Sequence, residues 1–164
     1  MSSQTTVGTP VTIQPDYIRT GMVKIRSTTL SVATDQRLDL IDLTGLVRSF
    51  VAGAGIAEGH AQVWSLHTTA GVFINEWQEA LLADMKTTIA RLLPQDFYYQ
   101  HNDPALSDCD RRNGDAHLRS MLVGQNVVIP LARGGLLLGR WQRVILAEFD
   151  GPNERQVFVQ VFGI

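Results

Sequence analysis

Residues 143–162 read Arg-Val-Ile-Leu-Ala-Glu-Phe-Asp-Gly-Pro-Asn-Glu-Arg-Gln-Val-Phe-Val-Gln-Val-Phe, and this stretch decides the fold class. Its two ends, 143–149 and 156–162, place β-branched and other apolar side chains at alternating positions, which is the period of a strand. Between them, Gly151-Pro152-Asn153 has the composition of a turn. The stretch therefore predicts two strands joined by a turn.

Segments with the same period precede this stretch. Further strands are expected over residues 22–32, 37–43, 61–67, 72–76 and 126–131. The first two flank the turn Thr34-Asp35-Gln36, so we expect them to pair as a hairpin. Arg133-Gly134-Gly135 is a second hairpin signal, after which the apolar residues 136–138 return along the sheet.

Two stretches have helical spacing instead. Residues 46–54 repeat apolar side chains every three or four positions after Thr44, which we expect to cap that helix. Residues 78–93 form the longest helical pattern, and Pro94 ends it. A short helical turn is expected over 117–122.

Strand pairs with two main intervening helices predict the fold class. They indicate a single α+β domain over residues 21–164, built on a mostly antiparallel β-sheet or sandwich. Residues 1–20 are rich in Ser, Thr, Gly and Pro and show little pattern, so we expect them to be a flexible leader.

The composition excludes several classes of protein. The 164 residues carry a net charge of −2, with 45% hydrophobic and 18% charged residues. This balance argues against a nucleic-acid or anionic-membrane partner, and no apolar run is long enough to span a bilayer. The single cysteine cannot form an internal disulfide. We therefore expect a soluble cytoplasmic protein.

A polar segment from His101 to His117 interrupts the regular pattern. It contains four aspartates, two arginines and the only cysteine, Cys109, and it lacks a periodic apolar face. We expect a loop with Pro104 and Asn113-Gly114 as turn residues. A long polar loop in a compact domain is either functional or a solvated excursion, and its histidines and carboxylates favour function. The carboxylates beside Cys109 disfavour its thiolate, so we do not expect a nucleophile.

Two further polar clusters stand at the ends of expected strands. His67-Thr68-Thr69-Ala70-Gly71 offers an imidazole, two hydroxyls and turn amides that can hold an anion. Gly139-Arg140-Trp141-Gln142 places an indole and an amide after a glycine. Taken singly, His67 and Trp141 are more often core residues. The spacing of the histidines matches no zinc-finger or helical metal motif.

Four motifs together resemble the YjbQ family. They are His67-Thr-Thr-Ala-Gly-Val-Phe-Ile-Asn-Glu76, Tyr99-Gln-His-Asn102, Asn113-Gly-Asp-Ala-His-Leu118 and Leu136-Leu-Leu-Gly-Arg-Trp-Gln142, in the family's order. That family is described as a secondary thiamine-phosphate synthase. The resemblance implies a small α+β domain that assembles as a homotrimer, with a polar site around three histidines. Arg140 stands where the family motif has threonine, and Trp77 also departs from the pattern.

The resemblance and the residue types lead to explicit expectations for the site. We expect catalytic roles for His67, Glu76, His101 and His117, and substrate contacts from Thr68, Thr69, Asn102, Arg140, Trp141 and Gln142. We expect His67, His101 and His117 to hold a divalent metal, Zn²⁺ or Mg²⁺, if one is used.

The expected function is a thiamine-phosphate synthase-like reaction, as main or side activity, on a small phosphorylated molecule. Three histidines also suit a second reading, a metal-dependent hydrolase or Lewis-acid enzyme. A third is a non-catalytic trimeric binding protein, in which the histidines pack internally.

Overall fold

The computed structural model describes residues 17–164; residues 1–16, and with them most of the expected leader, lie outside the described residues. Eight strands and three α-helices follow one another along the described chain, with a short 3-10 helix before the last α-helix. In order they are β1 (Lys24–Ala33), β2 (Asp39–Asp42), α1 (Thr44–Ala52), β3 (Gly59–Ser65), β4 (Ala70–Glu76), α2 (Glu79–Leu92), η1 (Gln100–Asn102), α3 (Gly114–Val123), β5 (Asn126–Ala132), β6 (Gly135–Leu136), β7 (Gln142–Glu148) and β8 (Glu154–Gly163).

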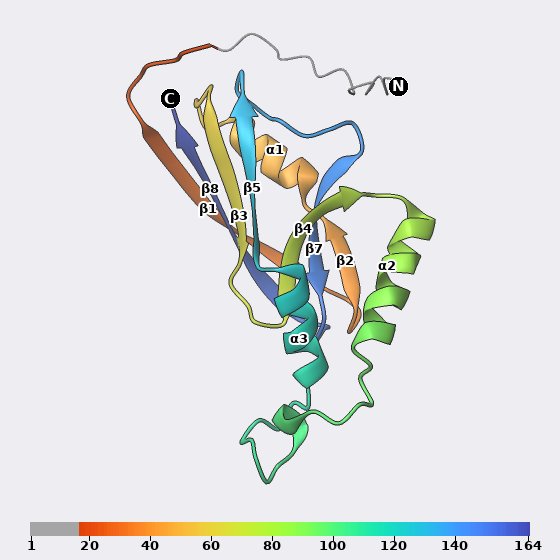
Figure 1. Cartoon of the computed structure of the whole chain (residues 1–164). Helices are drawn as coiled ribbons and strands as arrows, with labels where there is room; N and C mark the ends of the chain where they lie inside the picture. The colour runs from red at the N-terminus through yellow and green to blue at the C-terminus, as the bar shows by residue number, and fades with distance from the viewer. Residues whose placement is uncertain (1–16) are drawn as a thin grey trace, which may run out of the picture.

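The strands form two antiparallel sheets (Figure 1). The larger has the order β1-β8-β3-β5-β6 and the smaller has the order β2-β7-β4. The main core lies between the sheets and is closed by α1, with contributions such as Val159 from the large sheet, Val144 from the small one and Val47 from α1. The expected α+β class and mostly antiparallel architecture are confirmed.

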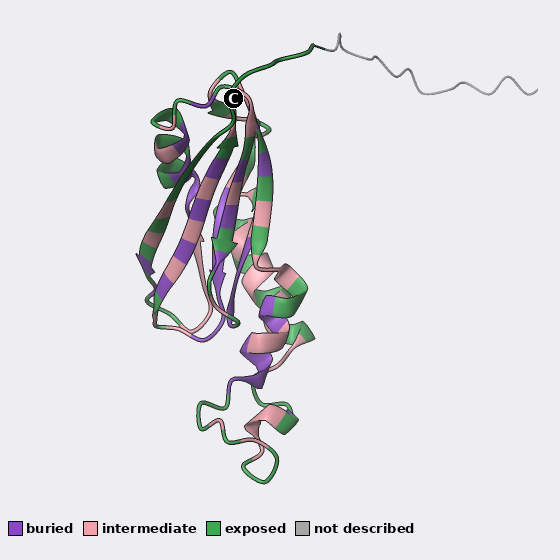
Figure 2. Ribbon diagram, turned by 90° about the vertical axis from the view of Figure 1, so that its left-hand side faces the viewer, coloured by how far each residue is buried: buried purple, intermediate pink, exposed green. Residues whose placement is uncertain are grey.

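Alternation along the strands follows from this layering. In β8, Val157, Val159 and Val161 are buried while the residues between them are less buried (Figure 2). The central strand β7 is different because both of its faces are covered. Val144 and Leu146 face the main core, and Ala147 belongs to a second apolar cluster on the opposite face, toward α2 and α3.

The two strands expected over residues 143–162 form, but they lie in different sheets. β7 pairs with β2 and β4, whereas β8 pairs with β1 and β3. The chain crosses between the layers at Gly151, where a Cβ atom would lie 2.2 Å from the carbonyl oxygen of Gln36. Only glycine allows such a close backbone approach.

The hairpin expected over residues 22–43 is wrong for the same reason. β1 and β2 also lie in different sheets, so the turn at residues 34–36 is a second crossing. The two crossings are adjacent: the amide of Thr34 donates to Asn153 O at 2.9 Å, and the amide of Gly151 donates to Arg37 O at 3.1 Å. Both sheet-to-sheet connections therefore meet at one corner of the sandwich.

The helices agree with expectation in place but differ at their ends. Thr44 is not the cap of α1: Leu43 is, and the Thr44 hydroxyl accepts a hydrogen bond from the amide of Val144 at 2.9 Å. Gln78 caps α2 by accepting from the amide of Leu81 at 2.8 Å. Helix α3 begins at Gly114, so the C-terminal end of the expected polar loop is helical. Within residues 17–164, no helix is both long and apolar enough to cross a membrane.

Candidate functional site

The polar segment projects beyond the sandwich, at the end of the small sheet where β4 begins and β7 ends (Figure 1). Asn102 fastens it to α3, because its Oδ1 accepts from the amide of Gly114 at 2.9 Å. Gly114 must be small there, since a Cβ atom would lie 2.8 Å from Cβ of Tyr99. The loop and the first turn of α3 are thereby held against each other.

This arrangement brings His101 and His117 into contact. Their ring centroids are 4.8 Å apart and their planes meet at 83°, edge to face. Nε2 of His101 is buried and has no hydrogen-bond partner among the described residues. Burial and the neighbouring His101 lower the pKa of His117, while Asp150 and Asp115 act in the opposite direction. His117 is therefore held toward its neutral form.

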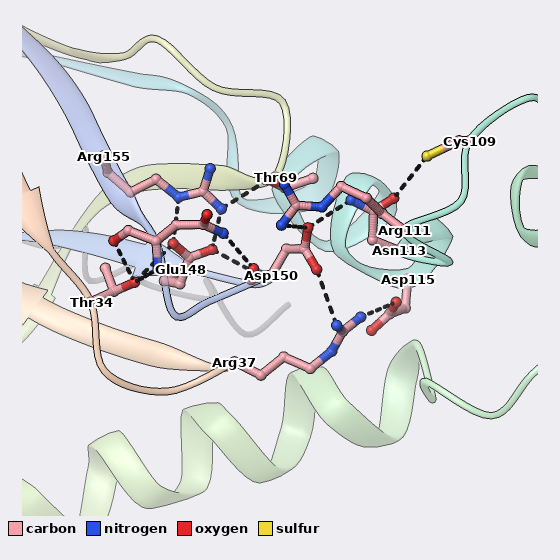
Figure 3. Close-up of polar contacts among 11 residues, drawn as sticks. Thr34, Arg37, Thr69, Cys109, Arg111, Asn113, Asp115, Glu148, Asp150 and Arg155 are labelled. Atoms are coloured by element: carbon pink, nitrogen blue, oxygen red, sulfur yellow. Dashed lines mark hydrogen bonds and ion pairs between the residues drawn. The ribbon is translucent and has the colours of Figure 1, made fainter.

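A network of ion pairs and hydrogen bonds surrounds the buried Asp150 and Asp115, near the start of α3 (Figure 3). Asp150 accepts from Arg37 Nη1 at 3.0 Å and from Asn113 Nδ2 at 2.7 Å, and it pairs with Arg111 Nη2 at 3.1 Å. The fully buried Asp115 accepts from Arg37 Nη2 at 3.0 Å and pairs with Arg119 at 3.2 Å. Because Arg37 bridges the two carboxylates, it ties the β1–β2 crossing to α3 and to the β7–β8 crossing.

A second buried cluster lies at the same corner. The carboxylate of Glu148 binds the guanidinium of Arg155 and accepts hydrogen bonds from the Thr34 hydroxyl and from the amide of Asp150. Arg155 also donates to the Thr69 hydroxyl at 3.0 Å. Four hydrogen bonds to one buried carboxylate, two of them from the guanidinium, offset the cost of removing its charge from water.

His67 belongs to this second cluster. Its Nε2 accepts a hydrogen bond from the amide of Gln156 at 2.7 Å. Burial and the positive charge of Arg155 lower the pKa of His67, and Glu148 partly opposes them. Because Nε2 accepts the hydrogen bond from Gln156, it carries no proton, and the ring in this arrangement has its proton on Nδ1. Nε2 is unavailable as a metal ligand while that hydrogen bond persists.

Four expected site residues lie at the opposite end of the small sheet from Glu148. Ala70 is opposite Glu148 at one end of the β4–β7 ladder, and Glu76 is opposite Gln142 at the other. Those six residue steps separate the two ends by about 20 Å. The far end carries Glu76, Gln142, the 58% exposed Trp141 and Arg140, whose guanidinium lies 4.6 Å from the Trp141 ring centroid. One chain alone therefore does not unite the whole expected set.

The remaining residues fall into two groups. His101, Asn102 and His117 lie together, and His67, Thr68 and Thr69 lie at the same end of the sandwich beside Arg155. Among residues 17–164, no three His, Cys, Asp or Glu side chains are arranged to hold a metal ion. The three histidines of a single chain thus do not form the expected metal shell. Cys109 is half-buried, with Sγ 3.9 Å from Asn113 Oδ1, and its lack of nucleophilicity stays a prediction.

Sequence reasoning missed the charged residues that organise this corner. Arg37, Asp150 and Arg155 stand in no motif that spacing identifies. One signal was visible: Glu148 shares its face of β7 with Val144 and Leu146, and a carboxylate on an apolar face requires a buried partner. The partner, Arg155, then lies on the next strand.

Comparison with known proteins gives consistent similarities. The family model described as UPF0047 protein YjbQ-like matches residues 28–164. A UPF0047 protein of Methanothermobacter thermautotrophicus is 37% identical over 82% of this chain and 90% of its own length. The UPF0047 protein YugU of Bacillus subtilis is 33% identical over 82% of this chain and 98% of its own. The crystal structure of a YbjQ-like protein from Sulfolobus solfataricus superposes with a TM-score of 0.82 at 31% identity, over 87% of this chain and all of that one.

Proposed function

Because the chain belongs to the UPF0047 family of YjbQ-like proteins, we propose that it is an enzyme acting on a small phosphorylated molecule at the His101–His117 pair. The reaction class is a thiamine-phosphate synthase-like transfer, as main or side activity. The observation that carries the proposal is the contact between the two imidazoles. In it the pKa of His117 is lowered, and Nε2 of His101 is buried without a hydrogen-bond partner among residues 17–164.

The proposed transfer needs positive charge and hydrogen-bond donors near the leaving diphosphate. In such a transfer a thiazole ring nitrogen attacks the methylene carbon of a pyrimidine methyl diphosphate, the C–O bond breaks, and diphosphate leaves with the bonding electrons. Positive charge and hydrogen-bond donors stabilise the leaving group. Arg111 pairs with Asp150 yet its side chain is 56% exposed, so its guanidinium is accessible to a ligand. His101 and His117 exchange protons with the leaving diphosphate or donate hydrogen bonds to it.

A test compares diphosphate release by wild type, His117→Asn and His60→Asn, with the pyrimidine methyl diphosphate and the thiazole phosphate as substrates. His60 stacks on Phe162 in the large sheet and is the matched control. We expect His117→Asn to lower the rate by about 10²-fold or more and His60→Asn to leave it unchanged. Equal rates for all three proteins would refute the role of the histidine pair.

A metal-dependent hydrolase or Lewis-acid enzyme is the second candidate. It is favoured by Nε2 of His101, which is buried and has no partner in the described part of the chain. His101 and His117 would bind a divalent ion, Zn²⁺ or Mg²⁺, which when bound acts as a Lewis acid on a phosphoryl oxygen. Two imidazoles are fewer than the three protein ligands of a catalytic zinc site. Elemental analysis of protein purified without a His-tag distinguishes this candidate: less than about one equivalent of metal under conditions that support turnover would exclude it.

We also propose a cytoplasmic homotrimer, following the family resemblance. Helix α2 has no buried residue in the single chain, although Leu81, Met85 and Ile89 line a groove of about 430 Å³ between α2 and the small sheet. Such apolar surface favours association. Light scattering tests the proposal, and a monomer mass at micromolar concentration contradicts it. A trimer without turnover would favour the third candidate, a non-catalytic binding protein.

A further inference from the structure

Arg155 lies at the corner where β3 ends and β8 begins, and one nitrogen of its guanidinium makes no hydrogen bond within residues 17–164. Arg155 is 6% exposed. Its Nε and Nη2 are engaged by Glu148 and Thr69, whereas Nη1 makes no hydrogen bond within residues 17–164 and reaches the molecular surface. In Figure 3 the Nη1 atom points away from Glu148. The guanidinium is thus held by Glu148 and Thr69, and Nη1 remains a hydrogen-bond donor without a partner in the described residues.

His67 offers a second donor at the same place. Because Nε2 accepts from the amide of Gln156, the proton of the neutral ring is on Nδ1. Nδ1 has no partner among the described residues and is not enclosed. The two side chains lie close together. His67 binds the amide of residue 156, Thr69 binds the side chain of residue 155, and the charge of Arg155 contributes to the lowered pKa of His67.

We propose that Nδ1–H of His67 and Nη1 of Arg155, next to the exposed residue Thr68, form a binding subsite for a phosphoryl group. The subsite gives His67 the role of a hydrogen-bond donor to the ligand in place of the expected metal ligand. It rests on the proposed function only in that the ligand is phosphorylated. Fixed donors bind an oxyanion without the entropy cost of ordering long side chains.

The charge balance defines the ligand further. Glu148 pairs with Arg155, and the His67 ring that accepts from Gln156 carries no charge, so the subsite supplies directed donors and little net charge. A phosphoryl group presents several oxygens to such donors, whereas acetate presents two. We therefore expect inorganic phosphate and diphosphate to bind more tightly than acetate.

Two substitutions of His67 separate the roles of its nitrogens. Glutamine places an oxygen near the position of Nε2 and so keeps an acceptor for Gln156 while removing the Nδ1 donor; asparagine keeps a donor near Nδ1 and loses the acceptor. In amide NMR titrations with inorganic phosphate, we expect wild type to show saturable shifts at Gln156 and Thr69. We expect His67→Gln to weaken phosphate binding about tenfold, since a charge-assisted hydrogen bond is lost, with little change in Tm. We expect His67→Asn to lower Tm and to bind phosphate more tightly than His67→Gln.

Controls make the outcomes decisive. Arg48→Met removes an exposed arginine of α1 and should not change phosphate affinity. Unchanged affinity in His67→Gln, shifts confined to Arg111 and Arg112, or equal affinity for acetate would each overturn the subsite. Turnover of the His117→Asn enzyme is measured separately. Loss of turnover in His117→Asn, together with unchanged phosphate affinity in His67→Gln, overturns the subsite and leaves the proposed function standing. Full turnover of the His117→Asn enzyme, together with weakened phosphate affinity in His67→Gln, refutes the proposed function and leaves the subsite standing.

Discussion

The imidazole of His101 meets the ring of His117 edge to face, with ring centroids 4.8 Å apart, because Asn102 hydrogen-bonds the first turn of α3. Each histidine comes from a different element, one from the 3-10 helix η1 and the other from α3. Two like-charging groups at this separation disfavour double protonation. The proximity of His101 is accordingly one cause of the lowered pKa of His117.

The first prediction concerns this coupling. His101→Phe keeps an aromatic ring beside His117 but removes the neighbouring charge that lowers the His117 pKa. The pKa of His117 should rise toward its ordinary value, while burial still holds it below. Histidine NMR titration of wild type and variant measures the shift. A His117 pKa that falls, or does not move, would show that His101 is not a cause of the lowering.

The second prediction concerns stability against pH. The folded-state pKa values of His67 and His117 are lowered, so the unfolded chain binds more protons as the pH falls. The stability that neutral imidazoles contribute is complete above the unfolded pKa of about 6.5. It declines as the pH falls from there through the folded pKa values. Urea unfolding between about pH 7.5 and pH 5 measures this slope.

His67→Gln provides the control for that slope. Glutamine keeps an acceptor for the amide of Gln156 and does not titrate, so the variant should lose the part of the slope that His67 supplies. A slope identical to that of wild type would mean that His67 is not coupled to folding.

The third prediction concerns Arg37. Arg37→Met leaves Asp115 with Arg119 and leaves Asp150 with Asn113 and Arg111, but it removes two charge-assisted hydrogen bonds. The Arg37 side chain is 31% exposed, so solvent screens part of the effect. We expect the free energy of unfolding to fall by about 1.5–3 kcal/mol. Arg48→Met, at an exposed position, should change it by less than about 0.5 kcal/mol. An equal loss of unfolding free energy in both variants would show that the Arg37 bridge contributes no more to stability than an exposed arginine.

The fourth prediction concerns the crossing at Gly151. A Cβ atom there would lie 2.2 Å from Gln36 O and 2.9 Å from Cγ of Glu148, so Gly151→Ala must displace the crossing. We expect a loss of about 1–3 kcal/mol or more. Gly45 in α1 is the matched control, because a Cβ atom there meets nothing within 4 Å. Gly45→Ala should be neutral or stabilise the fold by up to about 1 kcal/mol. Thermal unfolding of both variants tests the contrast, which an undisturbed Gly151→Ala would contradict.

Local periodicity predicted the strands well and their partners poorly. Alternation in β7 and β8 identifies which side chains share a face, but it contains no information on which strand lies alongside. Periodicity therefore predicts one hairpin for segments 22–32 and 37–43, although hydrogen bonding to β8 and β7 places them in two sheets. Helix α2 was predictable because its pattern is long and its cap, Gln78, is local.

The site was predictable only in part, for a related reason. Motif resemblance indicated His101, Asn102 and His117, which the fold does bring together. The residues that hold them are joined over long separations: Arg37 reaches Asp115 across 78 positions and Asp150 across 113. Such ion pairs leave no periodic signal. The separation of Trp141 from the histidines depends on strand length and register, which appear only once the sheet is assembled.

Helix α2 has a consequence for the dynamics of the chain. A helix with no buried residue contributes few tertiary contacts to hold its backbone hydrogen bonds closed. In a dissociated chain, its amides should exchange with solvent through local opening that leaves the sandwich folded. Amide exchange in α2, relative to exchange in β7, should therefore become slower when another chain covers the groove between α2 and the small sheet.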